Sequence, residues 1–574
     1  MVRASRLHLP TLKEAPAEAQ LASHRLLLRG GFIRQVSAGR YHVLPLGARV
    51  LSKLEALVRA EFEALGGQEL RVPTPSSSDP GLDPGAVRAA DRRPTEDLDV
   101  TVLSLLTALA RDELRSYRQL PQLWYTLQRS LCDEARPRAG FLRLRERTRL
   151  DACAFDLADG GEQARALRQA CSRLFARLSL PVVEAQASLD GATAFLVRAD
   201  AGDAHVTRCL GCESVALEDV ALVPRTEPPP TPESDEPAAL ATASGSPGLE
   251  KFATPGALTI EALVAPPHGV PAARQLKTLV YLSSRGPVVA VVRGDHVLAE
   301  PKLATASAAS WVRPARPDEI RQLMGASAGS LGAVGFVAAP LFVDRDLDSA
   351  RDMVTGANQD GFHLRGVDVR RDLLPHGSLI ELRQAQATDR CARCGGETER
   401  FAALELGRVT PHATRLSEPM RARVLSVSGQ QTALTMTSAS LEIERILAAA
   451  MDRHHDEAGP LLPWPIAPFG AAVLVLGKEP EVLEAAAAVA TALSAAGLHV
   501  LLDDRDERAG SKFKDVELWG IPLSVAVGKK GLAEGKVEWR VRRAGTSELL
   551  PIEGLAERVA KERAVQVGGR ERGV

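Results

Sequence analysis

Two pairs of cysteines have the residue type and spacing that most directly suggest chemistry. The pairs are Cys209-Leu-Gly-Cys212 and Cys391-Ala-Arg-Cys394. In a reducing compartment, two such pairs indicate a metal before a disulfide. Four thiolates would hold zinc tetrahedrally and leave no open position, so the expected role is structural. Because the pairs are far apart in the chain, free or vestigial thiols remain the alternative.

A cluster of arginines is the second group that could do chemistry, because guanidinium groups bind phosphates in a bidentate manner. The cluster lies within 14 residues and comprises Arg136, Arg138, Arg143, Arg145, Arg147 and Arg149. The alternative is a solvated basic face with no ligand.

The composition is that of an ordinary globular chain with several domains. The chain has 574 residues, of which 45% are hydrophobic and 25% charged, with a net charge of −1. This length predicts three or four domains, and the charge argues against a basic nucleic-acid coat. No long apolar stretch or signal-like N-terminus is apparent, so we expect a cytoplasmic protein with no membrane or DNA partner.

Periodicity and breaker residues predict the helices, strands and linkers around these groups. Apolar residues at three- and four-residue steps predict a helix over 47–65, followed by a strand over 68–72 and a loop over 74–96. The segments 225–250 and 459–465 are rich in proline and predict linkers. Between the linkers, the clearest strands are 276–282 and 288–293.

The C-terminal block alternates between the two periodicities. Strands are predicted over 471–476, 498–503 and 523–527, with helices over 482–496 and 512–519. This βαβαβ order predicts a small, mainly parallel sheet covered by helices.

Motifs in family order give the chain a recognisable relationship. They are Ser37–Tyr41 with the following helix to Pro73, Glu113–Pro121, Asp133–Arg138 with Arg143–Glu146, Lys277, Gly294–His296, Gly356–Asn358, Asp503–Arg505, Glu507–Arg508, Gly510 and Gly520–Pro522. Together they resemble the bacterial-type prolyl-tRNA synthetases, a class II family, over nearly the whole chain.

The resemblance implies an α/β protein with an α+β catalytic core. The core would be a class II antiparallel sheet with helices, in two parts over 1–224 and 386–465. An inserted α/β editing domain would occupy 225–385, and an α/β anticodon-binding domain 466–574. It also implies a homodimer formed through motif 1, with tRNA, most specifically proline tRNA, as the partner.

The residues expected to activate proline have largely been replaced. The motif 2 arginine that would contact the ATP α-phosphate is Cys132, the glutamate for the substrate ammonium is Leu103, and the motif 3 glycine run is Thr437–Glu442. A family lysine–aspartate pair is Leu150-Asp151. The remnants of the substrate and ATP site are Thr101, Glu134, Arg136, Arg138, Arg143 and Arg445. ATP and Mg²⁺ are therefore expected only if ligase activity survives.

The inserted domain retains the residues that the resemblance assigns to editing. In the family, this domain hydrolyses alanine from mischarged proline tRNA. The matching positions are Lys277, Gly294, Asp295, His296, Gly329, Gly332 and His363. Each lysine or histidine taken alone is more often a solvated charge or a structural group. As a set in family order, they predict a deacylase.

The C-terminal block carries the positions expected to bind the anticodon loop. They are Asp503, Asp504, Arg505, Glu507, Arg508, Phe513 and Glu517, with nearby Lys512, Lys514, Lys529 and Lys530 as phosphate contacts. The alternative is that several of them only hold the domain together.

These observations support three functional hypotheses. The first is a hydrolase that edits Ala-tRNA(Pro) on a ligase scaffold, with cysteine as an alternative acyl group. The second is a proline–tRNA ligase with a divergent site, and the third is a non-catalytic tRNA-binding regulator. Loss of the charge-stabilising arginine favours the first over the second, since one such group contributes about a hundredfold in rate.

Overall fold

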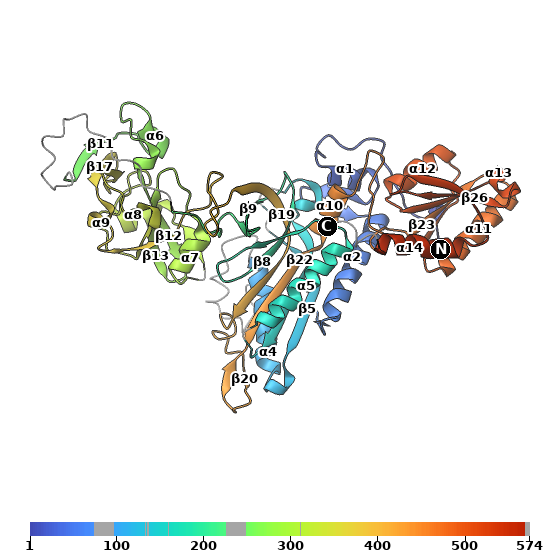
Figure 1. Ribbon diagram of the computed structural model, residues 1–574, viewed down its shortest axis with the longest axis horizontal. Coiled ribbons are helices and arrows are strands. Elements are labelled where there is room, and N and C mark those ends of the chain that lie inside the picture. The colour runs from blue at the N-terminus through green and yellow to red at the C-terminus, as the bar shows by residue number, and fades with distance from the viewer. Residues whose placement is uncertain are drawn as a thin grey trace. The chain divides into compact units, whose positions relative to one another are not determined.

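The computed structural model describes residues 1–73, 97–132, 134, 137–158, 160–225, 248–309 and 311–568. The chain forms two compact units (Figure 1). The first comprises residues 1–82, 94–182 and 406–574, and the second residues 83–93 and 183–405. The predicted loop over 74–96 and most of the predicted linker over 225–250 lie outside the described residues.

The first unit contains an antiparallel sheet backed by long helices. Strands β5 (Gln122–Leu131), β6 (Glu146–Asp156), β22 (Thr435–Glu442) and the second half of β19 (Thr398–Ala413) pair in that order. The short parallel strand β4 (Gln68–Glu69) pairs with β5, so the strand predicted over 68–72 is real but shorter.

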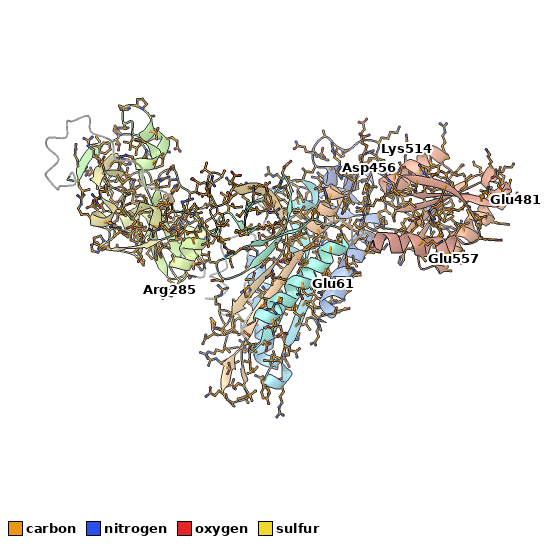
Figure 2. All side chains as sticks on the ribbon, in the orientation of Figure 1. Glu61, Arg285, Asp456, Glu481, Lys514 and Glu557 are labelled. Carbon is orange, nitrogen blue, oxygen red and sulfur yellow. The ribbon has the colours of Figure 1, made fainter. Side chains whose placement is uncertain are left out.

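The helix predicted over 47–65 is confirmed as α2 (Pro45–Glu63). Pro45 favours a start there because its fixed φ suits the first helical turn. Its apolar face is buried, and α5 (Gly161–Arg177) packs beside it. Glu61 of α2, labelled in Figure 2, accepts hydrogen bonds from Arg173 and Arg177 of α5 at 2.9 and 3.0 Å. The helix α10 (Ile443–Arg453) follows directly from β22.

The C-terminal sheet confirms the predicted βαβαβ order. Strands β24 (Val500–Asp503), β23 (Ala471–Leu476) and β25 (Leu523–Gly528) are parallel, with helices α11 (Pro480–Ala495) and α12 (Ala509–Leu518) between them. The prediction missed the antiparallel strands β26 (Lys536–Val541) and β27 (Thr546–Pro551). It also missed β1 (Val2–Arg3), which pairs with β24.

The second unit contains three groups of strands. A five-stranded sheet has the order β14 (Val312–Pro314), β12 (Leu276–Ser283), β13 (Gly286–Arg293), β15 (Leu341–Asp344) and β18 (Gly377–Ile380). A three-stranded sheet comprises β11 (Glu250–Ala253), β17 (Phe362–Val367) and β16 (Met353–Gly356). The first half of β19 belongs with β7 (Val183–Gln186), β8 (Thr193–Arg198), β9 (Ala204–Cys209) and β10 (Val215–Leu217). The strands predicted over 276–282 and 288–293 are confirmed as β12 and β13.

Candidate active sites and metal centre

The described residues of motifs 2 and 3 in the first unit enclose a small cavity. A cavity of about 20 Å³ is lined by Cys132, Glu134, Phe141, Leu142, Arg143, Leu144, Arg147, Glu442, Glu444 and Arg445. That volume holds about one water molecule, whereas ligand pockets are typically several hundred Å³.

The charged groups around this cavity are paired with one another. Glu442 lies 3.2 Å from Arg147 and 3.8 Å from Arg149, and Arg149 lies 2.9 Å from Asp151. Arg445 donates to the Leu142 carbonyl at 3.0 Å. The acidic Glu442 stands at a position where the resemblance expects glycine, and it neutralises the arginines that a phosphate would need.

Two further groups line this cavity, the half-buried Cys132 and the buried Glu444. The Cys132 thiol contacts the Leu144 carbonyl oxygen at 2.7 Å, and burial raises its pKa. Burial also raises the pKa of Glu444 to about 7, although Thr148 donates to it from its backbone and hydroxyl at 2.8 and 2.9 Å. Neither group presents a positive charge to a ligand.

The segment expected to form the proline pocket is helical. Residues 99–104 lie in α4 (Asp97–Glu113), and Leu103 is buried in an apolar cluster with Trp124 and Phe155. A leucine in this cluster cannot meet a substrate ammonium. Of the predicted remnants, Arg138 is exposed, whereas Arg136 and the side chain of Thr101 lie outside the described residues.

The editing residues of the second unit converge through strand register. Gln275, just before β12, forms a parallel bridge with Val354 of β16, and two residues further along each chain lie Lys277 and Gly356. Gly356 in turn pairs with His363 of β17. His363 therefore lies opposite Gly356, and Lys277 lies two residues beyond the bridge that joins its strand to β16.

Lys277 is held with its amine half-buried. Its Nζ donates to the His296 carbonyl oxygen at 2.9 Å. Burial lowers the pKa of Lys277, while the carboxylates of Glu261 and Asp295 oppose that shift. One of its three N–H donors is used in this contact, which leaves donors for a ligand.

The glycine loop is fixed against Gly356 and the residues that follow it. The Asn358 side chain donates to the Gly332 carbonyl and accepts from its N–H, both at 2.8 Å. A Cβ at Gly332 would lie 1.9 Å from the Gly356 carbonyl oxygen. Gly329 has a φ of +98° and packs against Leu258, so both positions require glycine.

His363 is buried, and its orientation is set by Thr254. The Nδ1 atom of His363 and the Thr254 hydroxyl lie 2.6 Å apart. Burial lowers the pKa of this histidine, and nearby His268 adds to the shift. Sequence analysis missed Thr254, because a threonine directly after a short strand has no distinctive spacing.

The Gly294–His296 turn contributes mainly through its backbone. Gly294 donates to Gln275 at 2.8 Å, and Asp295 pairs with Arg293 at 2.6 Å. The His296 ring is buried beside Asp344 and Asp346. Its pKa is lowered to about 4 by burial and then by Arg293. The part of this histidine that reaches Lys277 is therefore its carbonyl oxygen, not its ring.

The predicted anticodon-binding residues divide into two groups. Arg505 pairs with Asp503 and Asp515 at 2.8 and 2.9 Å and lies over the Trp519 ring, so it is structural. Asp504 pairs with Arg3, while Phe513 and Glu517 are partly buried. The prediction that Lys512 contacts phosphate is wrong, because its buried Nζ donates to the Val475 and Asp503 carbonyls.

The second group of anticodon-domain residues is exposed. Glu507 and Arg508 lie in the segment that leads into α12, and Lys514 lies on that helix, where Figure 2 labels it. These side chains are placed to meet a ligand without disturbing the domain.

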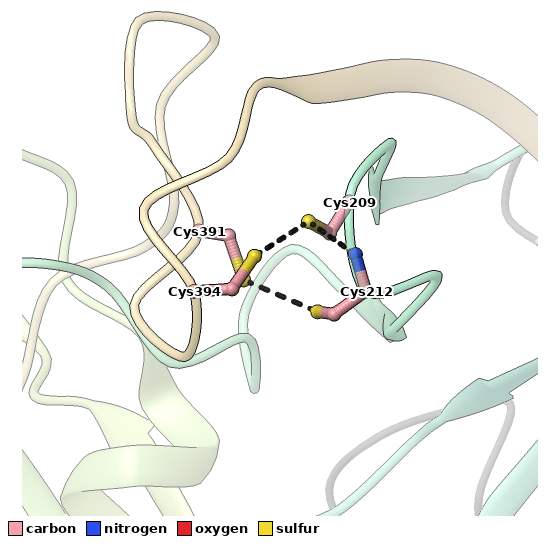
Figure 3. Close-up of side chains that lie close together, drawn as sticks. All are labelled: Cys209, Cys212, Cys391 and Cys394. Atoms are coloured by element: carbon pink, nitrogen blue, oxygen red, sulfur yellow. Dashed lines mark hydrogen bonds between the residues drawn. The ribbon is translucent and has the colours of Figure 1, made fainter.

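The two cysteine pairs meet in space (Figure 3). The sulfur atoms of Cys209, Cys212, Cys391 and Cys394 all lie within 4.8 Å of one another. Cys209 and Cys394 are 3.4 Å apart, Cys212 and Cys391 are 3.7 Å apart, and all four thiols are free. The predicted meeting of the pairs is confirmed.

Comparison with known proteins places these features in one family. A model described as "Aminoacyl-tRNA editing domain" matches residues 254–372, and one described as "Anticodon binding domain" matches 471–562. "Proline--tRNA ligase 1" of Anaeromyxobacter dehalogenans is 50% identical to the chain, with 98% of each covered. The chain belongs to the bacterial-type prolyl-tRNA synthetase family.

The chain is also similar to more distant members of the prolyl-tRNA synthetase family. "Proline--tRNA ligase" of Oleidesulfovibrio alaskensis is 38% identical, with 97% of this chain and 98% of that protein covered. A crystal structure of prolyl-tRNA synthetase from Cryptosporidium parvum with L-proline and AMP has a TM-score of 0.54. It is 12% identical and covers 98% of this chain and 79% of that one, a likeness of fold alone. Among the described residues, no helix is long and apolar enough to cross a membrane.

Proposed function

We propose that this member of the prolyl-tRNA synthetase family hydrolyses mischarged Ala-tRNA(Pro) in its editing domain. The observation that carries the proposal is the contrast between two sites. In the domain that matches the editing family, Gly332 and His363 both lie against Gly356 of β16, and Lys277 lies on the strand that is bridged to β16. The motif 2 and 3 cavity, in contrast, has room for about one water.

The proposed reaction is ester hydrolysis. A water molecule attacks the carbonyl carbon of the aminoacyl ester, the bond to the ribose oxygen breaks, and that oxygen leaves with a proton. Free alanine and the uncharged 3′ end result. The Lys277 ammonium supplies positive charge near the terminal phosphate or the ester carbonyl, where preorganised charge lowers the barrier.

The remaining editing residues have positioning roles in this proposal. The 329–332 loop, held by Asn358, lets backbone approach the 3′ end closely. His363, fixed by Thr254, selects the acyl group by size. A small pocket excludes the proline ring by sterics, whereas binding alone separates alanine from other small side chains weakly.

A second candidate is proline–tRNA ligase activity with ATP and Mg²⁺. The relatives favour it more strongly than they favour hydrolysis alone, because proteins named as proline–tRNA ligases align with the whole chain at up to 50% identity. For this candidate to hold, Glu442 would have to move away from Arg147 and Arg149 to admit nucleotide. A tRNA-binding regulator without catalysis is the third candidate.

In all three candidates the partner is tRNA, with the exposed Glu507, Arg508 and Lys514 facing the anticodon loop. A homodimer through motif 1 and the domain boundaries at 224, 385 and 465 stay predictions.

Two assays on the full chain separate the candidates. Release of alanine from Ala-tRNA(Pro), abolished by Lys277→Ala, supports the hydrolase. Proline-dependent exchange of pyrophosphate into ATP supports the ligase. Binding of tRNA without either activity supports the third candidate, a non-catalytic tRNA-binding regulator.

A further inference from the structure

We propose that Cys209, Cys212, Cys391 and Cys394 bind one structural zinc ion that locks the base of the inserted domain. The proposal does not depend on which tRNA reaction the protein performs.

The distances between the sulfur atoms suit one tetrahedral ion. Zinc–thiolate bonds of about 2.3 Å place the sulfur atoms of a tetrahedron roughly 3.8 Å apart. The 3.4 Å between Cys209 and Cys394 and the 3.7 Å between Cys212 and Cys391 are close to that value. Both are far longer than a disulfide bond of about 2.05 Å.

The backbone around each pair is arranged alike. The N–H groups of Gly211 and Cys212 donate to the Cys209 sulfur at 3.3 and 3.4 Å. The N–H of Arg393 likewise donates to the Cys391 sulfur at 3.4 Å. Such N–H donors offset the excess negative charge of four thiolates on one divalent ion.

Two glycines allow the halves of the site to approach. A Cβ on Gly396 would lie 3.2 Å from the Cys394 sulfur and 3.4 Å from the Cys209 sulfur. A Cβ on Gly211 would meet the same two sulfurs at 3.5 and 3.8 Å. A side chain at Gly396 would therefore crowd the position that the ligands must share.

Zinc suits these thiols better than iron does. Cys212 and Cys394 are exposed to solvent, so a redox-active metal would be open to oxygen. Zinc has no redox chemistry and favours tetrahedral sulfur ligands. Four protein ligands also leave no position for a substrate.

The location of the cluster indicates what the ion would hold together. Cys209 ends β9 and the Cys391 loop leads into β19, which pairs with β9 from Thr398 opposite Cys209. A second connection joins the same two parts of the chain. The buried Nζ of Lys302 donates to the Ala221 and Arg383 carbonyls and to the Glu381 carboxylate at 2.7–2.8 Å. The ion would connect the two cysteine loops, and Lys302 connects Ala221 with Glu381 and Arg383.

The test measures zinc directly on the purified full-length protein. Elemental analysis is expected to find one zinc per chain. Titration of the thiols with an organomercurial, followed with a colorimetric zinc indicator, is expected to release it. Cys391→Ser should lower the zinc content at least tenfold, whereas Cys132→Ser, a matched thiol outside the cluster, should leave it unchanged. Because the wild-type measurement needs no variant, misfolding of Cys391→Ser does not affect it.

Limited proteolysis tests the proposed role of the ion. Removing zinc with a chelator should speed tryptic cleavage after Arg390 and Arg393 at least tenfold. Cleavage after the exposed turn residue Arg285, far from the cluster in sequence, should not change. A metal-free protein, stoichiometric iron, or a Cys209–Cys394 disulfide in the purified chain would overturn the proposal.

Discussion

The Glu442 carboxylate lies 3.2 Å from the Arg147 guanidinium and 3.8 Å from that of Arg149. Glu442 is the last residue of β22, in the segment where the family resemblance expects a glycine-rich run. It gives the partly buried Arg147 and the buried Arg149 an internal partner in place of a bound phosphate. A buried ion pair of this kind is costly to separate, because each charge would then need a new partner.

We predict that this protein does not activate proline with ATP. Proline-dependent pyrophosphate exchange should fall roughly a hundredfold or more below that of a relative that retains the motif 2 arginine. The Cys132→Arg variant should not restore it, since Leu103 and Glu442 remain. Saturable, proline-dependent exchange by the wild-type protein would contradict this prediction and favour the ligase candidate.

Removing the Lys277 amine should abolish editing. Lys277→Ala is expected to lower kcat/KM for deacylation of Ala-tRNA(Pro) by about a hundredfold or more, as expected for the loss of one preorganised charge. The matched control is Arg285→Ala, which Figure 2 labels at the exposed turn of the same β12–β13 hairpin. About 20 Å of strand β12 separates Lys277 from this turn. Equal activity of the two variants would rule out Lys277 as the catalytic cation.

The buried Glu444 should make the stability of the first unit depend on pH. Its pKa is raised to about 7 in the folded chain, against 4.5 for an ordinary glutamate. Between these values the unfolded chain ionises first, so the free energy of unfolding falls as pH rises, by on the order of 3 kcal/mol in all. This stability is fully present below about pH 4.5.

Glu444→Gln tests this dependence, because the amide can keep both contacts with Thr148 without a charge. Denaturant unfolding of the wild type and the variant at several pH values between 5 and 7.5 should show a smaller slope for Glu444→Gln. Parallel curves for the two proteins would show that Glu444 does not titrate in this range.

The sequence predicted elements better than it predicted the roles of charged residues. Strands and helices of the C-terminal block were predictable because period 2 and period 3.6 are distinct there. The strand β27 was missed because it is largely exposed and shows little apolar alternation. The strand β26 was missed although its apolar residues alternate and its alternate side chains are buried. The pairing of β1 with β24 joins residues about 500 positions apart, which local periodicity cannot reveal.

The roles of single charges depend on burial, which sequence does not show. Lys512 and Lys514 look equivalent in the chain, yet Lys512 is buried against two carbonyls and Lys514 is exposed. The His296 ring likewise turns into the protein, so its motif position indicated the turn but not what reaches Lys277. The cysteine pairs were predictable as a cluster because their spacing is specific for four-thiol sites.

Loss of the Lys302 amine should lower the stability of the inserted editing domain. Lys302→Met leaves the Glu381 carboxylate without this partner and two buried carbonyls without donors, which costs about 3–5 kcal/mol. Calorimetry of the full chain should show a lower transition temperature for the editing domain. Arg285→Met removes one exposed cation from the same domain and should leave that temperature nearly unchanged; an equal shift in both variants would refute the role of Lys302.

Two arginines three residues apart in the anticodon-binding domain should respond oppositely to substitution. Arg505→Ala leaves the fully buried Asp503 without its guanidinium, so the domain should lose about 3 kcal/mol of stability or more. Arg508→Ala removes an exposed side chain, so stability should change by less than about 0.5 kcal/mol.

If Arg508 contacts a tRNA phosphate, its loss should weaken tRNA binding and reduce the salt dependence of log K by about one unit of slope. Filter binding at several salt concentrations, with thermal unfolding of the same samples, measures both quantities. Unchanged tRNA affinity in a folded Arg508→Ala protein would remove this residue from the proposed anticodon surface.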